Sequence, residues 1–293
     1  MTASVFSWRS MLFVPVINDR FVQSALRRSA DAIQLDLEDS IALDQKEEAR
    51  NKVVAAAQLC DEHGFDVIVR VNRPWRMLLR DIEASVCTSV KALTLPKVPN
   101  PQFIQAVAEI LDEVELEKGV PAGSTRIIAM IEDAEGLHNM DAIAASHPRV
   151  CAMIVGAEDL AVSMHMSVSP DTLYVPNVLA VAACRRAGIA PIGFVGSVAD
   201  FADEAAFARV VERAAQLGFE GAFCIHPSQV DLANQAFMPS AEAVKKATAL
   251  LSVFEAEKAK GRAACTFEGR MVDAPVVKQA LRILEKGKAF GIA

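Results

Sequence analysis

The residues of this chain that could do chemistry follow directly after short apolar runs, and most of them are carboxylates. They are Asp36, Glu38, Asp39, Arg70, Asn72, Lys97, Glu132, Asp133, Glu158, Asp159, His226, Ser228 and Gln229. Carboxylates presented side by side suit a hard, oxygen-preferring cation such as Mg²⁺, which takes one or two protein carboxylates and leaves its other positions to water and substrate. The pattern therefore predicts a magnesium site. We assign Glu132 and Asp159 as its direct ligands because an apolar run stops just before each of them.

Three of these residues have a competing structural explanation. An acidic residue after a strand can cap the helix that follows, and both Asp39 and Asp159 are placed to do so. Arg70 lies between Val69 and Val71 in an apolar run. Its planar guanidinium could bind carboxylate or enolate oxygens, or it could form a structural ion pair with one of the acidic residues after the preceding run.

Lys97 and His226 also allow two interpretations each. Lys97 could be a Schiff-base lysine, but neighbouring carboxylates keep a lysine protonated, and this favours an ion-pair role. His226 precedes Pro227 and could act as a base. Histidines at such positions more often hydrogen-bond to the backbone of a turn, so the sequence leaves the role of His226 open.

The elements that must position these side chains alternate regularly. The apolar runs are Met11–Pro15, Ala32–Leu37, Val67–Val71, Ala92–Leu95, Ile127–Ile131, Val150–Val155, Ala190–Phe194 and Gly221–Ile225. They are continuous rather than alternating, which is typical of parallel strands covered on both faces. Helical periodicity lies between them, over Lys46–Glu62, Phe103–Glu117 and Ala202–Leu217, and further helices are expected after Arg20, Gly136 and Pro176.

Eight strands alternating with helices predict an α/β fold of the (β/α)8 TIM-barrel type, in which functional side chains collect at the carboxyl ends of the strands. The alternative is a doubly wound open sheet. That fold would more often carry a glycine-rich dinucleotide turn, and no G-x-G-x-x-G follows the first run. The barrel is therefore favoured.

The chain is expected to divide into a catalytic barrel over residues 1–238 and a C-terminal helical extension over residues 239–293. In the extension we predict a charged helix over Ala241–Ala259, an irregular linker over Gly261–Arg270, and a second helical segment over Val272–Lys288. This extension could cap its own barrel, pack on a neighbouring subunit, or act as a lid.

Composition excludes several classes of partner. Thirty Lys and Arg against thirty-seven Asp and Glu give a net charge of −7, which argues against a nucleic-acid surface. No uncharged stretch reaches the roughly twenty apolar residues of a membrane span. The six cysteines are scattered without a C-x-x-C pair, so neither a disulfide framework nor a zinc site is expected. A cytoplasmic location is the expectation.

Eight motifs carry a resemblance to a known family. They are R-S-M-L-F-V-P (Arg9–Pro15), D-L-E-D-S (Asp36–Ser40), R-V-N (Arg70–Asn72), L-P-K (Leu95–Lys97), M-I-E-D-A-E-G (Met130–Gly136), G-A-E-D-L (Gly156–Leu160), I-H-P-S-Q-V (Ile225–Val230) and G-R-M-V-D-A-P (Gly269–Pro275). In this order the chain resembles the citrate lyase beta-chain-like family, relatives of malyl-CoA and citramalyl-CoA lyases within the HpcH/HpaI aldolase superfamily.

The resemblance implies a Mg²⁺-dependent carbon–carbon lyase. Such an enzyme cleaves or forms a 3-hydroxyacyl-CoA thioester, such as citramalyl-CoA, malyl-CoA or citryl-CoA, to a keto acid plus acetyl-CoA. By this analogy Glu132 and Asp159 hold the metal, Arg70 meets the substrate and stabilises the enolate, and Lys97 belongs to the substrate site.

The analogy also implies that Asp36, Glu38 and Asp39 support metal-bound water without binding the metal themselves. It further implies that Asp273 reaches the active site of an adjacent subunit as acid or base, in a homo-oligomer that is a trimer or a multiple of one.

Three departures from the family pattern bear on the substrate. The chain has Pro15-Val16 where members commonly have P-G, Leu173-Tyr174-Val175-Pro176 where many have L-Y-A-R, and Gly193 where many have an aspartate. The alternatives are a metal-dependent aldolase acting on free 2-keto-3-hydroxy acids without CoA, an acyl-binding subunit of a lyase complex, and a thioesterase.

Overall fold

Eight parallel strands form the centre of one compact unit, Trp8–Asn234. The computed structural model describes residues 6–197 and 203–292. The strands are β1 (Ser10–Pro15), β2 (Ala32–Asp36), β3 (Asp66–Arg70), β4 (Val90–Leu95), β5 (Arg126–Ile131), β6 (Val150–Val155), β7 (Ala190–Pro191) and β8 (Ala222–Cys224). Their order in the sheet is β7-β6-β5-β4-β3-β2-β1-β8. An isolated parallel bridge between Ile192 and Gly221 joins β7 to β8, so the predicted (β/α)8 barrel is confirmed.

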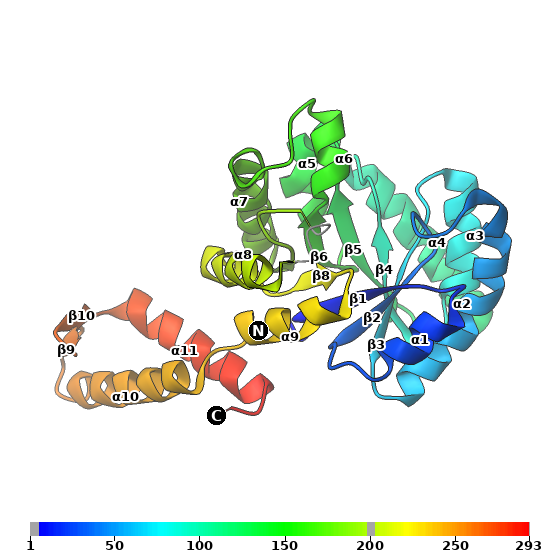
Figure 1. Ribbon diagram of the computed structural model, residues 1–293. Helices are drawn as coiled ribbons and strands as arrows, with labels where there is room; N and C mark the ends of the chain where they lie inside the picture. Colours follow the sequence, from blue (N-terminus) through cyan, green and yellow to red (C-terminus); the bar gives the residue numbers. More distant parts are fainter. Residues whose placement is uncertain (1–5, 198–202, 293) are drawn as a thin grey trace. The chain divides into compact units, whose positions relative to one another are not determined.

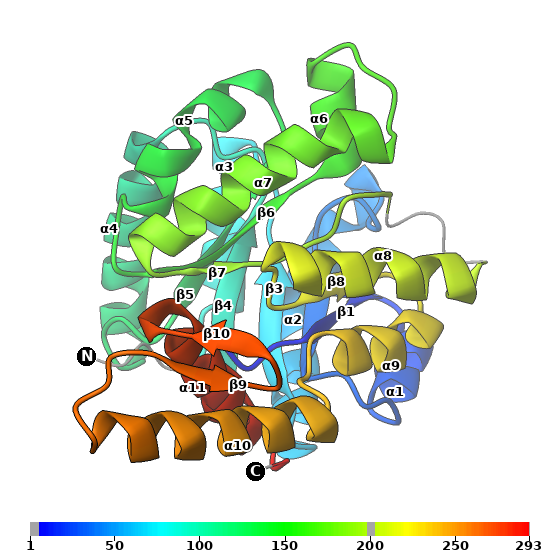
Figure 2. The ribbon, with the colours of Figure 1, turned by 90° about the vertical axis from the view of Figure 1, so that its left-hand side faces the viewer.

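Helices cover the outside of this barrel (Figures 1 and 2). They are α1 (Asp19–Ala25), α2 (Lys46–Glu62) after the short 3-10 helix η1 (Leu43–Gln45), α3 (Trp75–Ser85), α4 (Pro101–Lys118), α5 (Ala134–Ala144), α6 (Ala157–Ser163), α7 (Pro170–Ala187), α8 (Glu204–Leu217) and α9 (Pro227–Ala236). Burial on both faces explains the continuous apolar runs, since the barrel interior and the helices each exclude water from the strands. Among the helices described, none is long and apolar enough to cross a membrane.

Helix α7 differs from the prediction that a helix follows Pro176. It begins at Pro170, and Pro176 lies inside it. The start is set by a capping box in which the Ser169 and Thr172 side chains each accept from the other residue's backbone N–H, an arrangement that satisfies two otherwise unpaired donors. This local signal outweighs the cost of a proline in the second turn.

The chain from Gln235 onward belongs to a second compact unit, separate from Trp8–Asn234. It contains α10 (Ala241–Lys258), β9 (Cys265–Phe267), β10 (Arg270–Val272) and α11 (Ala274–Ala289). Leu250 and Phe254 of α10 pack in one apolar cluster with Val272 and Ala280. The functional division between residues 1–238 and 239–293 stays a prediction.

The predicted irregular linker over Gly261–Arg270 is wrong in part. Residues Cys265–Phe267 and Arg270–Val272 pair as an antiparallel hairpin. Its two-residue turn, Glu268-Gly269, has φ values of 49° and 75°. Positive φ at both turn positions matches the right-handed twist of a tight hairpin, and the glycine makes the second of them easy to adopt.

Candidate active site

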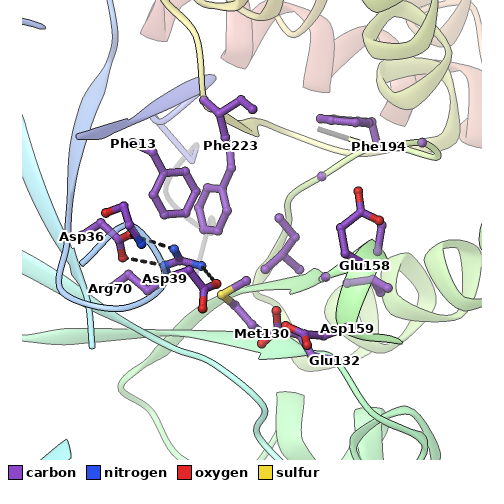
Figure 3. A pocket seen from close by; sticks show the side chains of 18 of the residues that line it. Phe13, Asp36, Asp39, Arg70, Met130, Glu132, Glu158, Asp159, Phe194 and Phe223 are labelled. Atoms are coloured by element: carbon purple, nitrogen blue, oxygen red, sulfur yellow. Dashed lines mark hydrogen bonds and ion pairs between the residues drawn. The ribbon is translucent and has the colours of Figure 1, made fainter. Parts of the chain in front are cut away.

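A pocket of about 490 Å³ opens at the carboxyl ends of the strands (Figure 3). Its charged lining residues are Asp36, Asp39, Arg70, Glu132, Glu158 and Asp159. Its large apolar lining residues are Phe13, Met130, Ile154, Phe194, Phe223 and Ile225. Six of the charged side chains predicted from the strand ends therefore meet in one place, beside an apolar wall that the sequence analysis did not anticipate.

Arg70 is held in place by three carboxylates. Its Nε and Nη2 donate to the two oxygens of Asp36 at 2.7 and 2.8 Å. Its Nη1 lies 2.9 Å from Glu38 and 3.2 Å from Asp39. The guanidinium carbon is 4.7 Å from the centre of the Phe13 ring. The ion-pair interpretation of Arg70 is thus confirmed. Because Arg70 also lines the pocket, the pairing orients the guanidinium without withdrawing it from a ligand.

The cluster around Arg70 contains more acid than base. Burial alone would raise the pKa of Asp36, but hydrogen bonds and charge from Arg70 outweigh it and hold this pKa below its ordinary value. Burial raises the pKa of Glu38 to about 8, against the attraction of Arg70 and with repulsion from Asp39 and Glu132. A carboxyl pKa raised this far is unusual and is typical of functional sites.

Glu132 lies at the end of β5 and is only 6% exposed. Its Oε2 accepts a 2.8 Å hydrogen bond from the backbone N–H of Lys97, a residue with a left-handed φ of 49°. A Cβ added to Gly156 would stand 2.4 Å from Glu132 Oε1, so the glutamate occupies the space that the glycine leaves. Burial, together with repulsion from Asp159, raises the pKa of Glu132 to about 7.

Asp159 lies in the first turn of α6 and forms a 3.1 Å ion pair with Lys97 Nζ. No side chain caps α6, whose N-cap residue is Gly156, so the capping explanation for Asp159 is wrong. Burial would lower the pKa of Lys97, but the hydrogen bond and charge of Asp159 outweigh it and raise this pKa. Lys97 is therefore held protonated, as the ion-pair interpretation predicts and a Schiff-base role does not.

The residues at the ends of β5 and β6 fit a divalent cation. Glu132 and Asp159 lie side by side at one end of the pocket (Figure 3), and the charge of Asp159 raises the pKa of Glu132. Two carboxylates that repel each other next to solvent-filled space are stabilised when a cation binds between them. Among the residues that the structure describes, no group of three or more His, Cys, Asp and Glu side chains forms a closed metal cage. A pair of carboxylates is the donor set that Mg²⁺ ordinarily takes from a protein.

The remaining candidates have structural or peripheral positions. The Asn72 amide donates to the Leu37 carbonyl and to Asp81. Asp133 caps α5 by accepting from the N–H of Gly136. These contacts explain both side chains without a ligand.

His226 is exposed, and its Nδ1 pairs with the Ser228 hydroxyl and backbone N–H. The buried Gln229 accepts from the N–H groups of Ile225 and His226. These contacts shape the turn after β8, as the structural interpretation of His226 predicts. Asp273 belongs to the second unit, where it caps α11 through the N–H of Val276.

Fold and pocket together define a class: a (β/α)8 barrel whose strand ends present paired carboxylates and one oriented arginine. The chain belongs to the HpcH/HpaI aldolase/citrate lyase family, whose model matches residues 9–227. It is 34% identical over 285 residues to the citrate lyase subunit beta of Leuconostoc mesenteroides, covering 96% of this chain and 93% of that protein.

Two further relatives extend the comparison. An L-malyl-CoA/beta-methylmalyl-CoA lyase of Cereibacter sphaeroides is 33% identical, with 96% of this chain and 94% of that protein covered. Among solved structures, the CitE protein of Mycobacterium tuberculosis in complex with magnesium, acetoacetate and coenzyme A matches with a TM-score of 0.73. It is 28% identical and covers 98% of this chain and 99% of that chain.

Proposed function

We propose that this chain is a Mg²⁺-dependent carbon–carbon lyase acting on a 3-hydroxyacyl-CoA thioester. The observation that carries the proposal is the pairing of Glu132 with Asp159 in the pocket that Arg70 also lines. Glu132 and Asp159 would hold the cation, which when bound acts as a Lewis acid on substrate oxygens. The family and its lyase members support the same chemistry.

The reaction requires three catalytic functions of the protein. In cleavage a base takes the hydroxyl proton of the substrate, the bond between the hydroxyl-bearing carbon and the neighbouring methylene carbon breaks, and a keto acid departs. The bonding electrons remain on the thioester as an enolate, which a proton converts to acetyl-CoA. The site must therefore accept a proton, stabilise an enolate and return a proton to carbon.

Arg70 is suited to stabilise the enolate. Its charge is fixed and its orientation is set by Asp36, so no reorganisation is needed when negative charge develops on the substrate. Glu38 and Asp39 share Nη1 of the same guanidinium, and the raised pKa of Glu38 suits this carboxyl group to carry a proton within the cluster. Lys97 would screen substrate carboxylate charge from its position beside Asp159.

We assign the return of the proton to Asp273. Its position in the second unit agrees with a tail that serves the barrel of an adjacent subunit, in a homo-oligomer that is a trimer or a multiple of one. Mixed oligomers made from Asp273→Asn and Arg70→Ala chains test this. Partial recovery of activity is expected, whereas no recovery means that Asp273 serves its own barrel or none.

A substrate panel tests the lyase itself. Purified protein with Mg²⁺ is expected to release a keto acid from malyl-, citramalyl- or citryl-CoA, and Glu132→Gln is expected to abolish this release. Glu135→Gln is the matched control, since Glu135 lies three residues on and pairs with Asn100. Activity on free hydroxy keto acids with no thioester requirement would instead favour the CoA-independent aldolase.

We further infer a cytoplasmic location. All six cysteines are free thiols, and burial raises the pKa of Cys60, Cys184 and Cys224 well above the ordinary thiol value. Buried, protonated thiols of this kind are unreactive and are common in proteins of a reducing compartment.

A further inference from the structure

We propose that the keto-acid half of the substrate carries an apolar substituent larger than methyl, either branched alkyl or aryl, which packs against Ile154, Phe194 and Phe223. This inference rests on the proposed lyase function and narrows its substrate class. It excludes as preferred substrates those whose keto acid bears a second carboxylate, a methyl group or only hydrogen at that position.

The pocket has two chemically distinct sides. The charged side is formed at the ends of β2, β3, β5 and α6 by Asp36, Arg70, Glu132 and Asp159. The other side is an apolar wall (Phe13, Ile154, Phe194, Phe223 and Ile225) built from β1, β6, β8 and the segments after β7 and β8. Met130 lies on the charged side, and Glu158 lies near Phe194 (Figure 3). Figure 3 shows Phe13 and Phe223 together at this wall, away from Glu132 and Asp159. Their rings pack edge to face with centroids 5.1 Å apart.

The wall contains no charge that could receive a second carboxylate. Among the described residues that line the pocket, Arg70 is the sole cation, and it belongs to the charged side, where it pairs with Asp36, Glu38 and Asp39. The segments 1–5 and 198–202 contain no Lys, Arg or His. A carboxylate placed against Phe194 and Phe223 would lose its hydration without gaining a partner, which is strongly unfavourable.

The backbone keeps this side apolar at one further position. Gly193 has a φ of 122°, and a Cβ there would meet Ile154 Cγ1 at 3.3 Å. A side chain at residue 193 is thus disfavoured both by conformation and by space. Residue 193 therefore places no side chain beside Ile154 on this side of the pocket.

Elimination assigns the ligand group. The hydroxyl-bearing carbon of the substrate carries four groups: the hydroxyl, the carboxylate, the methylene that leads to the thioester, and one substituent. The hydroxyl, the carboxylate and the thioester carbonyl all present oxygen and match the charged side, while the CoA chain must leave through the mouth. The substituent that departs with the keto acid is what remains for the apolar wall.

Condensation assays with Mg²⁺ and acetyl-CoA test the proposal. In this direction a base removes a methyl proton from the thioester, the resulting carbanion bonds to the keto carbon, and the keto oxygen gains a proton. The keto acids to compare are glyoxylate, pyruvate, 2-oxoisovalerate, phenylpyruvate and oxaloacetate. Each added buried methylene is worth about fourfold in kcat/KM, so the branched and aryl acids should exceed glyoxylate at least tenfold and oxaloacetate by more.

A charge added to the wall should reverse this order. Ile225 lines the pocket and is 39% exposed, so Ile225→Arg is expected to fold. It should improve oxaloacetate relative to phenylpyruvate by about tenfold or more in kcat/KM. Leu79→Arg is the matched control, because Leu79 is 37% exposed on α3 and is not among the described residues that line the pocket; it should leave the ratio unchanged.

Binding gives a readout independent of turnover. Calorimetry with Mg²⁺ should show tighter binding of 2-oxoisovalerate and phenylpyruvate than of oxaloacetate. A preference for oxaloacetate, glyoxylate or pyruvate in an active enzyme overturns the inference and leaves the lyase standing. The acyl group of the thioester can also be varied while pyruvate is kept as the keto acid. If the rate then depends on that acyl group, the wall binds the thioester half of the substrate, and this result also overturns the inference. Turnover of no keto acid with any thioester refutes the proposed function, whereas the binding order still decides the inference.

Discussion

Two buried arginine–carboxylate clusters stand at opposite ends of the barrel, and they differ in balance. At the amino ends of the strands Arg149 donates to Glu115 at 2.9 and 2.6 Å and also pairs with Asp112. Glu115 further accepts from the N–H groups of Gly123 and Thr125. Every charge in this cluster has a partner within the protein, so the cluster is saturated.

At the carboxyl ends more carboxylates share one arginine, and fewer backbone N–H groups stabilise them. Arg70 faces Asp36, Glu38 and Asp39, and Glu132 and Asp159 lie in the same pocket with Lys97 as the cation beside them. The pKa values record the difference. Hydrogen bonds from Arg149, Thr125 and Gly123 overcome burial and lower the pKa of Glu115 to about 2, whereas burial raises the pKa of Glu38 to about 8. A saturated cluster stabilises the fold, and an unsaturated one is available to a ligand.

Among these variants, Arg70→Lys is expected to have the largest effect, a loss of catalytic activity. Lysine keeps the charge but loses the planar fork, so we expect kcat/KM of the folded enzyme to fall by about a hundredfold to a thousandfold. Steady-state kinetics with the best thioester substrate measure this. Unchanged kcat/KM would mean that Arg70 only holds the strand ends together.

Arg149→Lys should affect stability alone. Loss of charge-assisted hydrogen bonds in a buried cluster is expected to lower the free energy of unfolding by about 2 kcal/mol, with kcat/KM of the folded enzyme unchanged. Urea denaturation measures the stability. Arg186→Lys is the control, since its pair with Asp141 is exposed and such pairs contribute less than about 1 kcal/mol. Reduced turnover in Arg149→Lys would show that the two ends are coupled.

Gly156→Ala should weaken the metal site without removing a ligand. The added methyl group would collide with Glu132 Oε1 at 2.4 Å and displace the carboxylate, so Mg²⁺ affinity should fall by about tenfold to a hundredfold. Titration calorimetry measures it. Gly196→Ala is the matched control, because Gly196 lines the same pocket but its Cβ would meet nothing closer than 3.5 Å. Equal Mg²⁺ affinity in the two variants would remove Glu132 from the ligand set.

The smallest expected effect is the pH dependence of stability, which should have opposite signs at the two ends. The raised pKa values of Glu132 and Glu38 mean that the folded chain binds more protons than the unfolded chain above about pH 4.5. Without Mg²⁺ this contribution to stability is therefore lost as pH rises toward 7 and 8. The lowered pKa of Glu115 contributes stability that is lost only as pH falls from about 4.5 toward 2.

Thermal unfolding from pH 5 to 8, with and without Mg²⁺, measures the first contribution. We expect the melting temperature of the metal-free protein to fall by a few degrees across this range. Mg²⁺ should oppose the fall, and Glu132→Gln should reduce its slope. A rise in melting temperature over the same range in the metal-free wild type would contradict the pKa values of this cluster.

Local signals in the sequence sufficed for the barrel and the polar part of its site. Uninterrupted apolar runs predicted seven strands to within two residues at their ends, while β7 (Ala190–Pro191) is shorter than predicted. Since parallel strands end at one edge of a sheet, the order of the runs was enough to predict that Asp36, Arg70, Glu132 and Asp159 lie together. The Glu268-Gly269 hairpin was missed because its turn is less distinctive than Asn-Gly or Asp-Gly.

The tertiary structure alone decided the environment of each side chain in the site, as opposed to which residues form it. Apolar residues inside a barrel look the same in sequence whether they fill the core or line a pocket, so the wall of Phe194 and Phe223 had no signature of its own. Likewise, the raised pKa of Glu38 and the space that Gly156 leaves for Glu132 depend on distance, burial and neighbouring charge. Those quantities arise only when strands distant in the chain come together, because electrostatic and steric interactions act through space and not along the sequence.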